Sequence, residues 1–447
     1  MGTEVATCRA GVARVCITPD LPCEMAGYFH SRTAESVARD LYASALVLEQ
    51  QGQHLVIVSG DLIAMTDEVC LPAFAAAQRQ YGIPLDHCIA CATHTHTGPE
   101  IRRGATNPCC EDYVQKLAAR LTEAVMSALG NRFDAVLCVG STRAPGLAHN
   151  RLSRCADGSE IFGRQTGSAR VIGAAGPEDD AVQTLSVYDA TKRLRAVAVN
   201  FACHPDLSGG GSAKAIHADW PGEMAEYLQR VHGPDLVCAV WQGTAGDINH
   251  ADHRAKVPRW LPGGCSAVAR GVAGATLYAL ETATPLSPLG LSGRRHEVAL
   301  PYYVRDATLL ELAETLKAKG DAATYFEKNL AKRIEAWPHD GKTDRVSVSC
   351  LRLGDLALVA LPGEIFTGWG LEIKRYSPAK HTFVLELASS HDGLTGYKAT
   401  SDQSLRGARG KGAYGALPTL SQKHCPASGQ MLTEAAIEML YELWPEG

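Results

Sequence analysis

Strand-like apolar runs alternate with helix-like runs along this chain, and that alternation constrains its fold more than any other feature. Apolar patterns predict strands at 44–49, 54–59, 86–91, 183–189, 194–203, 235–241, 346–353, 356–361 and 382–388. Helical periodicity predicts helices at 66–81, 111–129, 221–231, 265–282, 306–336 with a break near Gly320, and 430–443. This order predicts an α/β fold, and no internal repeat argues for a solenoid or a propeller.

The composition is that of a globular protein without a nucleic-acid partner. Of the 447 residues, 20% are charged and 46% are hydrophobic, and the formal net charge is -5. The sequence has no basic tail, no apolar run of membrane-spanning length and no secretion signal in its first ten residues. No low-complexity linker divides it. We therefore expect one domain over residues 1–447, no stable membrane insertion and a cytoplasmic location, with a homo-oligomer left open.

The fifteen cysteines predict buried thiols and no disulfide framework. Their count is odd, and they are scattered through strand-like and apolar segments. Cys88 and Cys91 form a CxxC, and Cys109 precedes Cys110. A zinc ribbon needs a second pair of matching spacing, and a redox CxxC stands at a helix start. Because the CxxC falls on a predicted strand, we expect its thiols to be structural.

The segment Cys91-Ala-Thr-His-Thr-His-Thr-Gly-Pro-Glu100 places His94 and His96 two residues apart at the end of a predicted strand. On an extended backbone, side chains at that spacing point to the same face. Two neutral imidazoles that converge beside a Gly-Pro turn suit a divalent metal, or one metal ligand and one proton-transfer group. The plain alternative is a pair of histidines in a polar loop.

Polar side chains also follow other predicted strands. His204 ends the run Asn200-Phe-Ala-Cys-His-Pro205, and Glu364 follows an apolar strand. Ligands of α/β proteins gather where loops leave the carboxyl ends of strands, so these side chains are expected to share one cleft. A single histidine at such a position more often has a structural role than a catalytic one, and this holds for His204 taken alone. Glu364 taken alone would simply stabilise, by its negative charge, the N-terminus of a helix that begins near Phe366.

Three further residues stand on loops near these segments. His217 and Asp219 lie just ahead of a proline-started helix, where Asp219 is explained equally well as a helix N-cap and as a support of the site. Tyr397 follows a glycine-rich turn, and its spacing alone predicts an ordinary packing residue, because tyrosine is rarely a zinc ligand.

Taken in order, a series of short motifs resembles the catalytic domain of the neutral/alkaline ceramidases, a family of zinc-dependent amide hydrolases. The resemblance covers nearly the whole chain. The motifs are Gly11-Val-Ala-Arg-Val-Cys-Ile-Thr18-Pro, Met25-Ala-Gly-Tyr28, Ser59-Gly-Asp61-Leu, Ala92-Thr-His-Thr-His-Thr-Gly-Pro99, Asn150-Arg151, Ala202-Cys-His-Pro205, Ala245-Gly-Asp247, Pro362-Gly-Glu364, Gly396-Tyr397 and Ala413-Tyr414-Gly.

The resemblance implies layered, mixed β-sheets with flanking helices, and one zinc ion, with a second divalent metal left open. Asp61 and Asp247 are interpreted as residues that orient histidines or loops beside the site, and a purely structural turn role explains them equally well. By position in the motifs, the implied zinc ligands are His94, His204, Glu364 and Tyr397, and the implied residues of the reacting centre are His96, Arg151 and Tyr414.

These assignments predict cleavage of an amide or ester bond. A catalytic zinc lowers the pKa of its bound water to about 7 and polarises a substrate carbonyl. His96 would take the proton of the water or deliver one to the leaving amine. Arg151 and Tyr414 would donate hydrogen bonds to substrate oxygens.

The chain departs from the ceramidases in ways that bear on the substrate. Asn249 stands where the family has a serine shortly after the Ala-Gly-Asp motif, and an asparagine is no hydroxyl nucleophile. Only about 30 residues follow Tyr414, whereas the immunoglobulin-like domain of secreted members needs about 100, so we expect the catalytic domain alone. A small, soluble N-acyl or ester substrate, not necessarily ceramide, is therefore predicted. Arg102 and Arg103 either attract an anionic group of it or form a solvated pair, and the second is favoured.

Two other functions are compatible with the same residues. An amidohydrolase-type enzyme would hold two metal ions with the help of His217, His250 or Asp219. A zinc-stabilised binding protein without turnover would use the four implied ligands as a closed set. Two metal equivalents would favour the first, and a His96 variant that keeps metal but loses hydrolysis would exclude the second.

Overall fold

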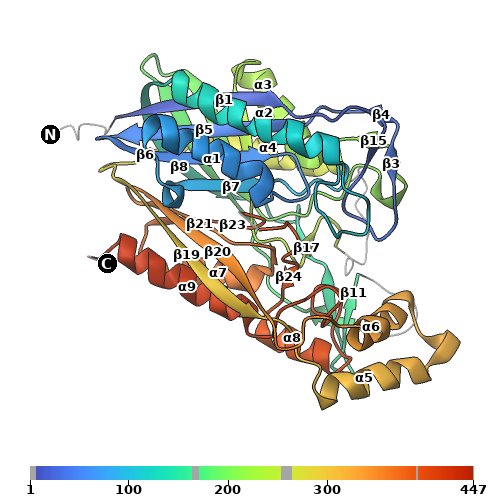
Figure 1. The fold of residues 1–447 in the computed structure, drawn as a ribbon. Helices are drawn as coiled ribbons and strands as arrows, with labels where there is room; N and C mark the ends of the chain where they lie inside the picture. The colour runs from blue at the N-terminus through green and yellow to red at the C-terminus, as the bar shows by residue number, and fades with distance from the viewer. Residues whose placement is uncertain (1–6, 164–170, 253–263, 389–390, 446–447) are drawn as a thin grey trace.

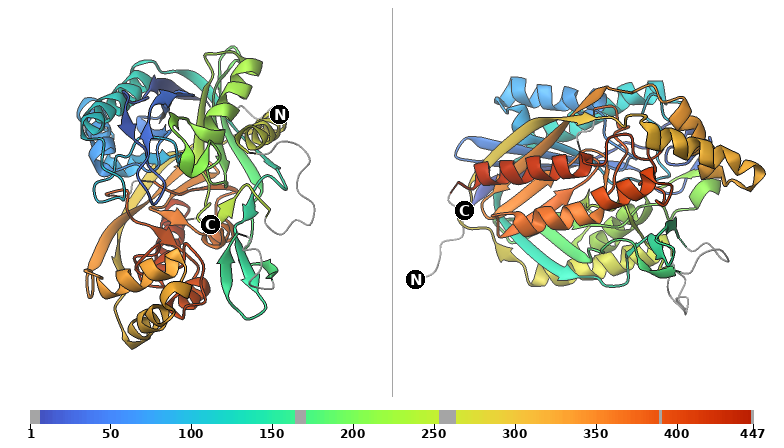
Figure 2. Two further views of the ribbon diagram at one scale, coloured as in Figure 1. Left: turned by 90° about the vertical axis from the view of Figure 1, so that its right-hand side faces the viewer. Right: turned by 90° about the horizontal axis from the view of Figure 1, so that it is seen from below.

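Four layers make up the fold in the computed structural model, which describes residues 7–163, 171–252, 264–388 and 391–445 (Figure 1). From top to bottom in Figure 1 they are a set of helices, a large sheet, a smaller sheet and a second set of helices. Seen from below in Figure 2, the helices of the last layer lie side by side across the smaller sheet. The expected α/β fold of layered, mixed sheets with flanking helices is confirmed.

The large sheet is mixed and, within the described residues, has nine strands in the order β16-β14-β13-β8-β1-β5-β6-β7, with β18 beside β8. β6 and β7 are parallel, as are β14 and β16, and the other pairs are antiparallel. Apolar runs such as residues 55–58 form central strands because both faces of the sheet are covered. The strands are β1 (Cys8–Cys16), β5 (Tyr42–Gln50), β6 (Gln53–Gly60), β7 (Cys88–Ala92), β8 (Phe133–Arg143), β13 (Ala181–Asp189), β14 (Leu194–Phe201), β16 (Val237–Gln242) and β18 (Thr284–Pro285).

The helices of the first layer cover the outer face of the large sheet. They are α1 (Asp67–Tyr81), α2 (Glu111–Gly130), α3 (Asp219–His232) and α4 (Cys265–Glu281). On α2, apolar side chains at helical spacing, such as Leu117, Leu121 and Val125, are buried against the sheet. Gly11 of β1 allows this close approach, because a Cβ there would collide with the Ala128 carbonyl oxygen.

The smaller sheet lies beneath the large one and is covered on its outer face by α7 (Thr367–Tyr376) and α9 (Ser428–Leu443). Leu55 and Ile57 of the large sheet share a buried core with Leu358 and Phe383 of the smaller one. Each such burial contributes about 1.5–3 kcal/mol, so the common core fixes the two sheets and their loops relative to each other. The strands run in the order β19 (Leu291–Pro301), β20 (Thr343–Leu353), β21 (Leu356–Ala360) and β23 (His381–Leu385).

Short elements surround the ends of the two sheets. α5 and α6 protrude at the lower right of Figure 1 and pack their apolar faces together. The short strands are β2 (Cys23–Glu24), β3 (Thr33–Ala34), β4 (Ser36–Val37), β9 (His149–Asn150), β10 (Leu152–Cys155), β11 (Glu160–Phe162), β12 (Val171–Ala174), β15 (Ala215–Ile216), β17 (Ile248–Asn249), β22 (Glu364–Ile365) and β24 (Tyr397–Lys398). The remaining helices are α5 (Ala307–Ala318), α6 (Tyr325–Glu335) and α8 (Ser401–Ala408), and the 3₁₀ turns are η1 (Leu85–His87), η2 (Gly210–Ser212) and η3 (Gly320–Ala322).

Twist in the large sheet explains how the ends of β7 and β14 meet. When the parallel and antiparallel pairs are followed across the sheet from β14 to β7, the two strands run in opposite directions. The path between them has six pairings, and at about 20–25° each these would turn β14 through roughly 120–150° relative to β7. The sheet also folds back on itself, since Ser59 Oγ of β6 donates to Val240 O of β16 at 2.7 Å. The loops after β7 and β14 therefore come to the same place.

Most of the predicted elements are confirmed, with ends shifted by a few residues. The predicted break near Gly320 is found, because η3 separates α5 from α6. β19 was not predicted, because the consecutive polar residues Arg294, Arg295 and His296 interrupt its apolar pattern in the partly exposed middle of the strand. None of the described helices combines the length and apolar character needed to cross a membrane.

Candidate active site

His94 and His96 lie in the loop that follows β7, not on the strand itself. β7 ends at Ala92, and His94 has a left-handed backbone conformation with φ of 74°. His94 N donates to Leu62 O at 2.8 Å, which ties the loop to the end of the neighbouring strand β6. The two imidazole rings lie together, with centroids 4.8 Å apart. The two imidazoles converge as expected, but the predicted reason is wrong. They converge because the backbone turns at His94, and not because an extended strand points both side chains to one face.

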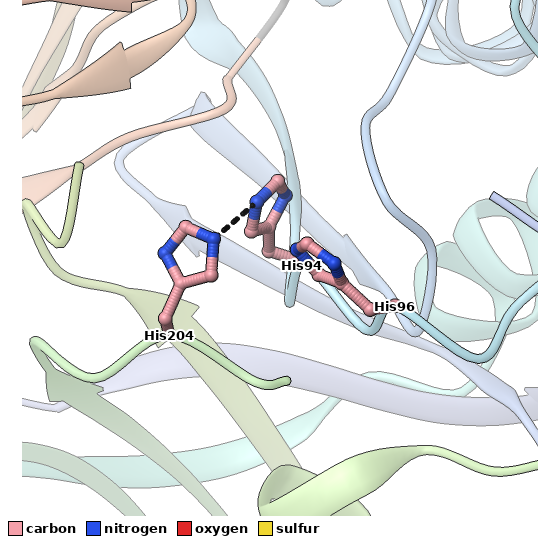
Figure 3. Close-up of side chains that lie close together, drawn as sticks. All are labelled: His94, His96 and His204. Carbon is pink, nitrogen blue, oxygen red and sulfur yellow. Dashed lines mark hydrogen bonds between the residues drawn. The ribbon is translucent and has the colours of Figure 1, made fainter. Parts of the chain in front are cut away.

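His204 follows β14 and faces His94 across the site (Figure 3). The two Nε2 atoms are 3.2 Å apart. His94 Nδ1 lies 2.7 Å from Ile63 O, and His204 Nδ1 lies 3.2 Å from Ala245 O. Because a carbonyl oxygen can only accept, each Nδ1 carries the ring proton, and both Nε2 lone pairs point into the same space.

Glu364 and Tyr397 reach this space from two short strands paired in parallel, β22 and β24, in which they are direct neighbours. Glu364 Oε2 lies 3.4 Å from His94 Nε2 and 3.7 Å from His204 Nε2. Burial alone would raise the pKa of Glu364, but His94 and a hydrogen bond from Tyr397 lower it to about 2. The Glu364 carboxylate is therefore ionised.

The three atoms that converge here, His94 Nε2, His204 Nε2 and Glu364 Oε2, are all acceptors, and Glu364 Oε2 has no hydrogen-bond partner. Buried acceptors that face one another without a donor are unfavourable unless a cation lies between them. Two ligands of a tetrahedral zinc ion with bonds of about 2.0–2.1 Å would be about 3.3 Å apart. The separations of 3.2, 3.4 and 3.7 Å fit that arrangement.

His96 stands beside this cluster and has the geometry of a proton-transfer group. Its ring centroid is 4.8 Å from that of His94 and 5.1 Å from that of His204. Both ring nitrogens are buried without a hydrogen-bond partner, and Nδ1 lies 3.9 Å from Asp206 Oδ1. Burial, with the neighbouring His94, lowers the pKa of His96 well below its usual value. His96 is therefore neutral and able to accept a proton.

Arg151 is buried beside Tyr397. Its Nη2 donates to Gly246 O at 2.7 Å and to the Tyr397 hydroxyl at 3.1 Å. Burial opposes its charge, but Tyr397 and Glu364 favour it, and the pKa of Arg151 is raised. The Tyr414 ring lies 5.2 Å from that of Tyr397. The structure thus brings both residues to the site, each with a hydrogen-bond donor.

Asp247 and Asp219 hold loops of the site and are not themselves among the converging acceptors. Asp247 accepts from Asn150 Nδ2 at 2.6 Å and from Thr367 N at 2.7 Å, so it joins the segment carrying Arg151 to the start of α7. Asp219 Oδ2 accepts from the backbone amides of residues 207 and 208 at 2.9 and 2.8 Å, which fixes the loop after His204. The N-cap of α3 is Ala218. Of the two interpretations of Asp219, the N-cap role is therefore wrong, and the role that supports the site by holding its loop is the one observed.

Asp61 is located at the end of β6, away from the converging acceptors. It accepts from Tyr42 N at 2.9 Å, and the side chain of Thr93, the residue before His94, lies near enough to lower its pKa slightly. Burial raises the pKa of Asp61 to about 6. It supports the loop of the histidines from behind.

The residues proposed for a second metal do not join the cluster. Among the described residues, His94, His96 and His204 form the group of His, Cys, Asp and Glu side chains close enough to share an ion, with ligand atoms within 4.8 Å. His217 instead accepts from Asp219 N at 2.8 Å, and His250 Nδ1 lies 2.6 Å from Asn249 Oδ1. A binuclear centre has no support in these positions.

Arg102 and Arg103 are both engaged in ion pairs. Arg102 binds the buried Glu100 through two hydrogen bonds of 2.8 and 2.7 Å, and Arg103 pairs with Glu68 and Glu111 at the surface. The description as a solvated pair holds for Arg103. It is wrong for Arg102, whose guanidinium has a buried partner.

Several residues that border the site were not predicted. Gly27, with φ of 101°, lies against His96, since a Cβ there would be 2.7 Å from the ring. The Tyr28 ring packs edge-on to His96 at 5.6 Å, and its hydroxyl hydrogen-bonds Asp206. Asp206 stands two residues after His204, which is the signal by which it could have been found. Glu386 is buried beside Glu364, and burial and that neighbour raise its pKa well above the usual value.

Solved structures of ceramidases share this fold. The crystal structure of neutral ceramidase from Pseudomonas aeruginosa has a TM-score of 0.74 and 16% identity, and the match covers 99% of this chain and 75% of that chain. A ceramidase complexed with C2 has a TM-score of 0.75 and 17% identity, over 99% and 76% of the two chains. No family model and no curated protein sequence matches this chain. The similarity therefore establishes a ceramidase-like α/β fold, as the motifs predicted.

Proposed function

We propose that the protein is a zinc-dependent hydrolase that cleaves an amide or ester bond. The convergence of three acceptor atoms with no donor among them, on His94, His204 and Glu364, in a fold shared with ceramidases, is the observation that carries this proposal. These residues would hold the ion, with Tyr397 beside them. When bound, a zinc ion lowers the pKa of a coordinated water to about 7 and polarises a carbonyl.

His96 is the proposed proton-transfer residue. Its imidazole is neutral at neutral pH, and both of its nitrogens lack partners inside the protein. A group in this state can take a proton from water and return it to the leaving amine or alcohol. Asp206, held by Tyr28, faces Nδ1 and would favour a proton on that nitrogen, which leaves Nε2 as the base.

Arg151 and Tyr414 are the proposed donors to the substrate carbonyl oxygen or to an acidic substrate group. Arg151 keeps its charge in a buried setting, and its Nε has no partner. Burial raises the pKa of Tyr414, so its hydroxyl stays protonated and able to donate. Donors already fixed in a buried site stabilise developing negative charge without reorganisation.

The proposed substrate is a small N-acyl or ester compound with an apolar group next to the scissile bond. Tyr414 is bordered by three aromatic rings from distant segments, Phe29, Phe162 and Phe326, with centroids 5.5, 5.9 and 5.6 Å away. Phe29 is 44% exposed and Phe162 is 38% exposed, and such surface is typical of a binding site. The ceramidase neighbours make an N-acyl lipid the first amide to test.

A closed structural zinc site is the second candidate, because four ligands are at hand. Two observations favour turnover. His96 has two buried nitrogens without partners, and Arg151 has one. Buried polar groups left unpaired cost stability unless they serve a ligand or a reaction.

The test combines metal analysis with a substrate panel. Purified protein would be assayed by mass spectrometry for metal and against N-acyl, ester and lactone substrates, ceramide included. We expect one equivalent of zinc and hydrolysis of at least one N-acyl or ester compound. One bound zinc with no turnover on the whole panel would support the structural site, and two equivalents would support a binuclear enzyme.

A further inference from the structure

Two cysteines that are far apart in the sequence meet behind the candidate active site. Cys23 lies on β2, and Cys110 is the N-cap residue of α2. Glu100 N donates to Glu24 O at 2.9 Å, and Cys110 N donates to Glu100 O at 2.8 Å, so the two segments are bound together. The Cys110 thiol donates to Glu24 O at 3.4 Å, and the Cys23 thiol lies close enough to shift the pKa of Cys110.

The two thiols line a cavity of about 430 Å³, which Cys109, Tyr113 and Thr33 also line. Cys23 is buried, and Cys110 is half-buried. A small reagent in the cavity would therefore meet Cys110 with Cys23 directly beside it.

The two sulfurs differ in character. The neighbouring Cys23, with a smaller contribution from the backbone of residues 24 and 100, lowers the pKa of Cys110 to about 7, although burial opposes this. Its place at the start of the twenty-residue helix α2 also favours a thiolate. The neighbouring Cys110 and burial raise the pKa of Cys23. Cys110 is thus the nucleophile of the pair, and Cys23 is the protonated neighbour.

We infer that Cys110 and Cys23 form a peroxide-reactive thiol pair, in which Cys110 is oxidised first and Cys23 closes a disulfide. The Cys110 thiolate attacks one oxygen of hydrogen peroxide, the O–O bond breaks, and a sulfenic acid and hydroxide form. The Cys23 sulfur then attacks the Cys110 sulfur, an S–S bond forms, and the hydroxyl group leaves with the Cys23 proton as water. Two sulfurs lose one electron each, and one peroxide becomes two waters once hydroxide is protonated.

The charges around the cavity favour a neutral oxidant. Asp20, Glu24, Glu111 and Asp112 line it, and Lys116 there is paired with Asp20. Carboxylates repel an anionic oxidant such as a glutathione-type disulfide, whereas hydrogen peroxide carries no charge. Small peroxides are therefore the proposed reagent class.

The pair is linked to the candidate active site through β2. Met25, the residue after that strand, bridges Pro99, and the chain then reaches Gly27 against His96. A disulfide would join this segment covalently to the start of α2. We expect oxidation to change the rate of hydrolysis, but the existence of the thiol pair does not depend on the proposed reaction.

The test is peptide mapping of the full chain after treatment with one equivalent of hydrogen peroxide, with free thiols blocked before digestion without reductant. The wild type should yield a Cys23–Cys110 linked peptide. Cys23→Ser should instead leave Cys110 as a sulfenic acid that dimedone traps, and Cys110→Ser should give neither product. Cys109→Ser is the matched control, since Cys109 lines the same cavity and should leave the linked peptide intact.

Alkylation rates give an independent measurement that needs no variant. At pH 7 a thiol with a pKa of about 7 is half ionised, and burial raises the pKa of Cys109 to about 11. Iodoacetamide should therefore modify Cys110 at least tenfold faster than Cys109. Equal rates, or a wild-type map in which peroxide modifies Cys109 or the exposed Cys16 while Cys110 stays free, would overturn the inference.

Discussion

Two pairs of potential metal ligands are neighbours in the sequence and have opposite outcomes. Cys88 and Cys91 stand in β7, and His94 and His96 stand in the loop that follows it. Cys88 contributes to the core beneath α1 and α2, whereas Cys91 contributes to the core between the two sheets. Burial raises the pKa of both thiols to about 12. The histidines, in contrast, share one polar space.

The difference shows that backbone conformation decides whether a pair of ligands can meet. In a strand, residues three apart point to opposite faces, so a CxxC there cannot close on one ion. Beyond Ala92 the chain leaves the sheet, and the left-handed residue His94 turns the following side chains inward. Four predictions test this contrast, from the largest expected effect to the smallest.

Replacing a ligand in the loop should remove the metal, whereas replacing a thiol in the strand should not. His94→Ala should lower zinc affinity by more than about 100-fold and abolish hydrolysis, because it deletes one of the converging acceptors. Cys91→Ala should keep the metal and cost about 1 kcal/mol of unfolding free energy through a small cavity. Metal content by mass spectrometry and denaturant unfolding measure both. Full zinc retention in His94→Ala would refute the proposed ligand set.

His96 should separate chemistry from metal binding. His96→Ala should leave zinc content unchanged and lower kcat by about 10²–10⁴-fold, because the proton-transfer group is lost. His391→Ala is a surface control, since that side chain is 73% exposed, and it should behave as the wild type. Loss of zinc in His96→Ala would show that His96 is a ligand instead.

Gly27→Ala should displace His96, one of the two histidines of the loop, without replacing any proposed zinc ligand. The new Cβ would lie 2.7 Å from the His96 ring, so the imidazole must move, and kcat should fall about tenfold to 100-fold with zinc retained. Gly52→Ala is the matched control, because Gly52 has a similar positive φ of 78° but nothing within 4 Å of its Cβ. It should lose stability and keep its activity. Equal activity in the two variants would mean that His96 tolerates displacement.

The smallest effect is expected at Asp61, which supports the histidine loop from β6. Burial raises its pKa to about 6, against about 3.9 in an unfolded chain. The folded state therefore holds a proton that the unfolded state releases between these values. The stability that this bound proton contributes is fully present below about pH 4 and is lost as the pH rises through 6.

Part of the Asp61 side chain reaches solvent, so the change is reduced to about 1–3 kcal/mol. Asp61→Asn should flatten the fall in unfolding free energy between pH 4 and 7 by that amount. Denaturant unfolding at several pH values, wild type against variant, measures it. Identical slopes would show that Asp61 has the same pKa in both states.

Much of the layered fold could be predicted from the chain itself, because buried strands and amphipathic helices leave strong periodic patterns. The helices 67–81 and 111–130 and the strands around residues 55 and 358 are found within a few residues of their predicted limits. Polar strands such as β19 were missed, since the middle of that strand is partly exposed and its sequence there is polar.

The candidate site was predictable only in part. Local sequence identified His94, His204 and Glu364 as polar residues after strands, and their flanking motifs associated them with one family. Asp206 had one local signal, its place two residues after His204, whereas nothing local identified Gly27 as a neighbour of His96 or paired Cys23 with Cys110. Each of these contacts joins segments that are distant in the sequence or depends on a positive φ.

The sequence by itself determined which residue types stand at the ends of which elements, because hydrophobic periodicity and turn chemistry act locally. Only the tertiary structure decided that three acceptors, two in the loops after β7 and β14 and one on β22, meet within 3.2 to 3.7 Å. The physical reason is that the sheet twist and the core shared by the two sheets act across the whole chain. The turn at His94 is local, but it is held by a hydrogen bond to Leu62, which lies more than thirty residues earlier.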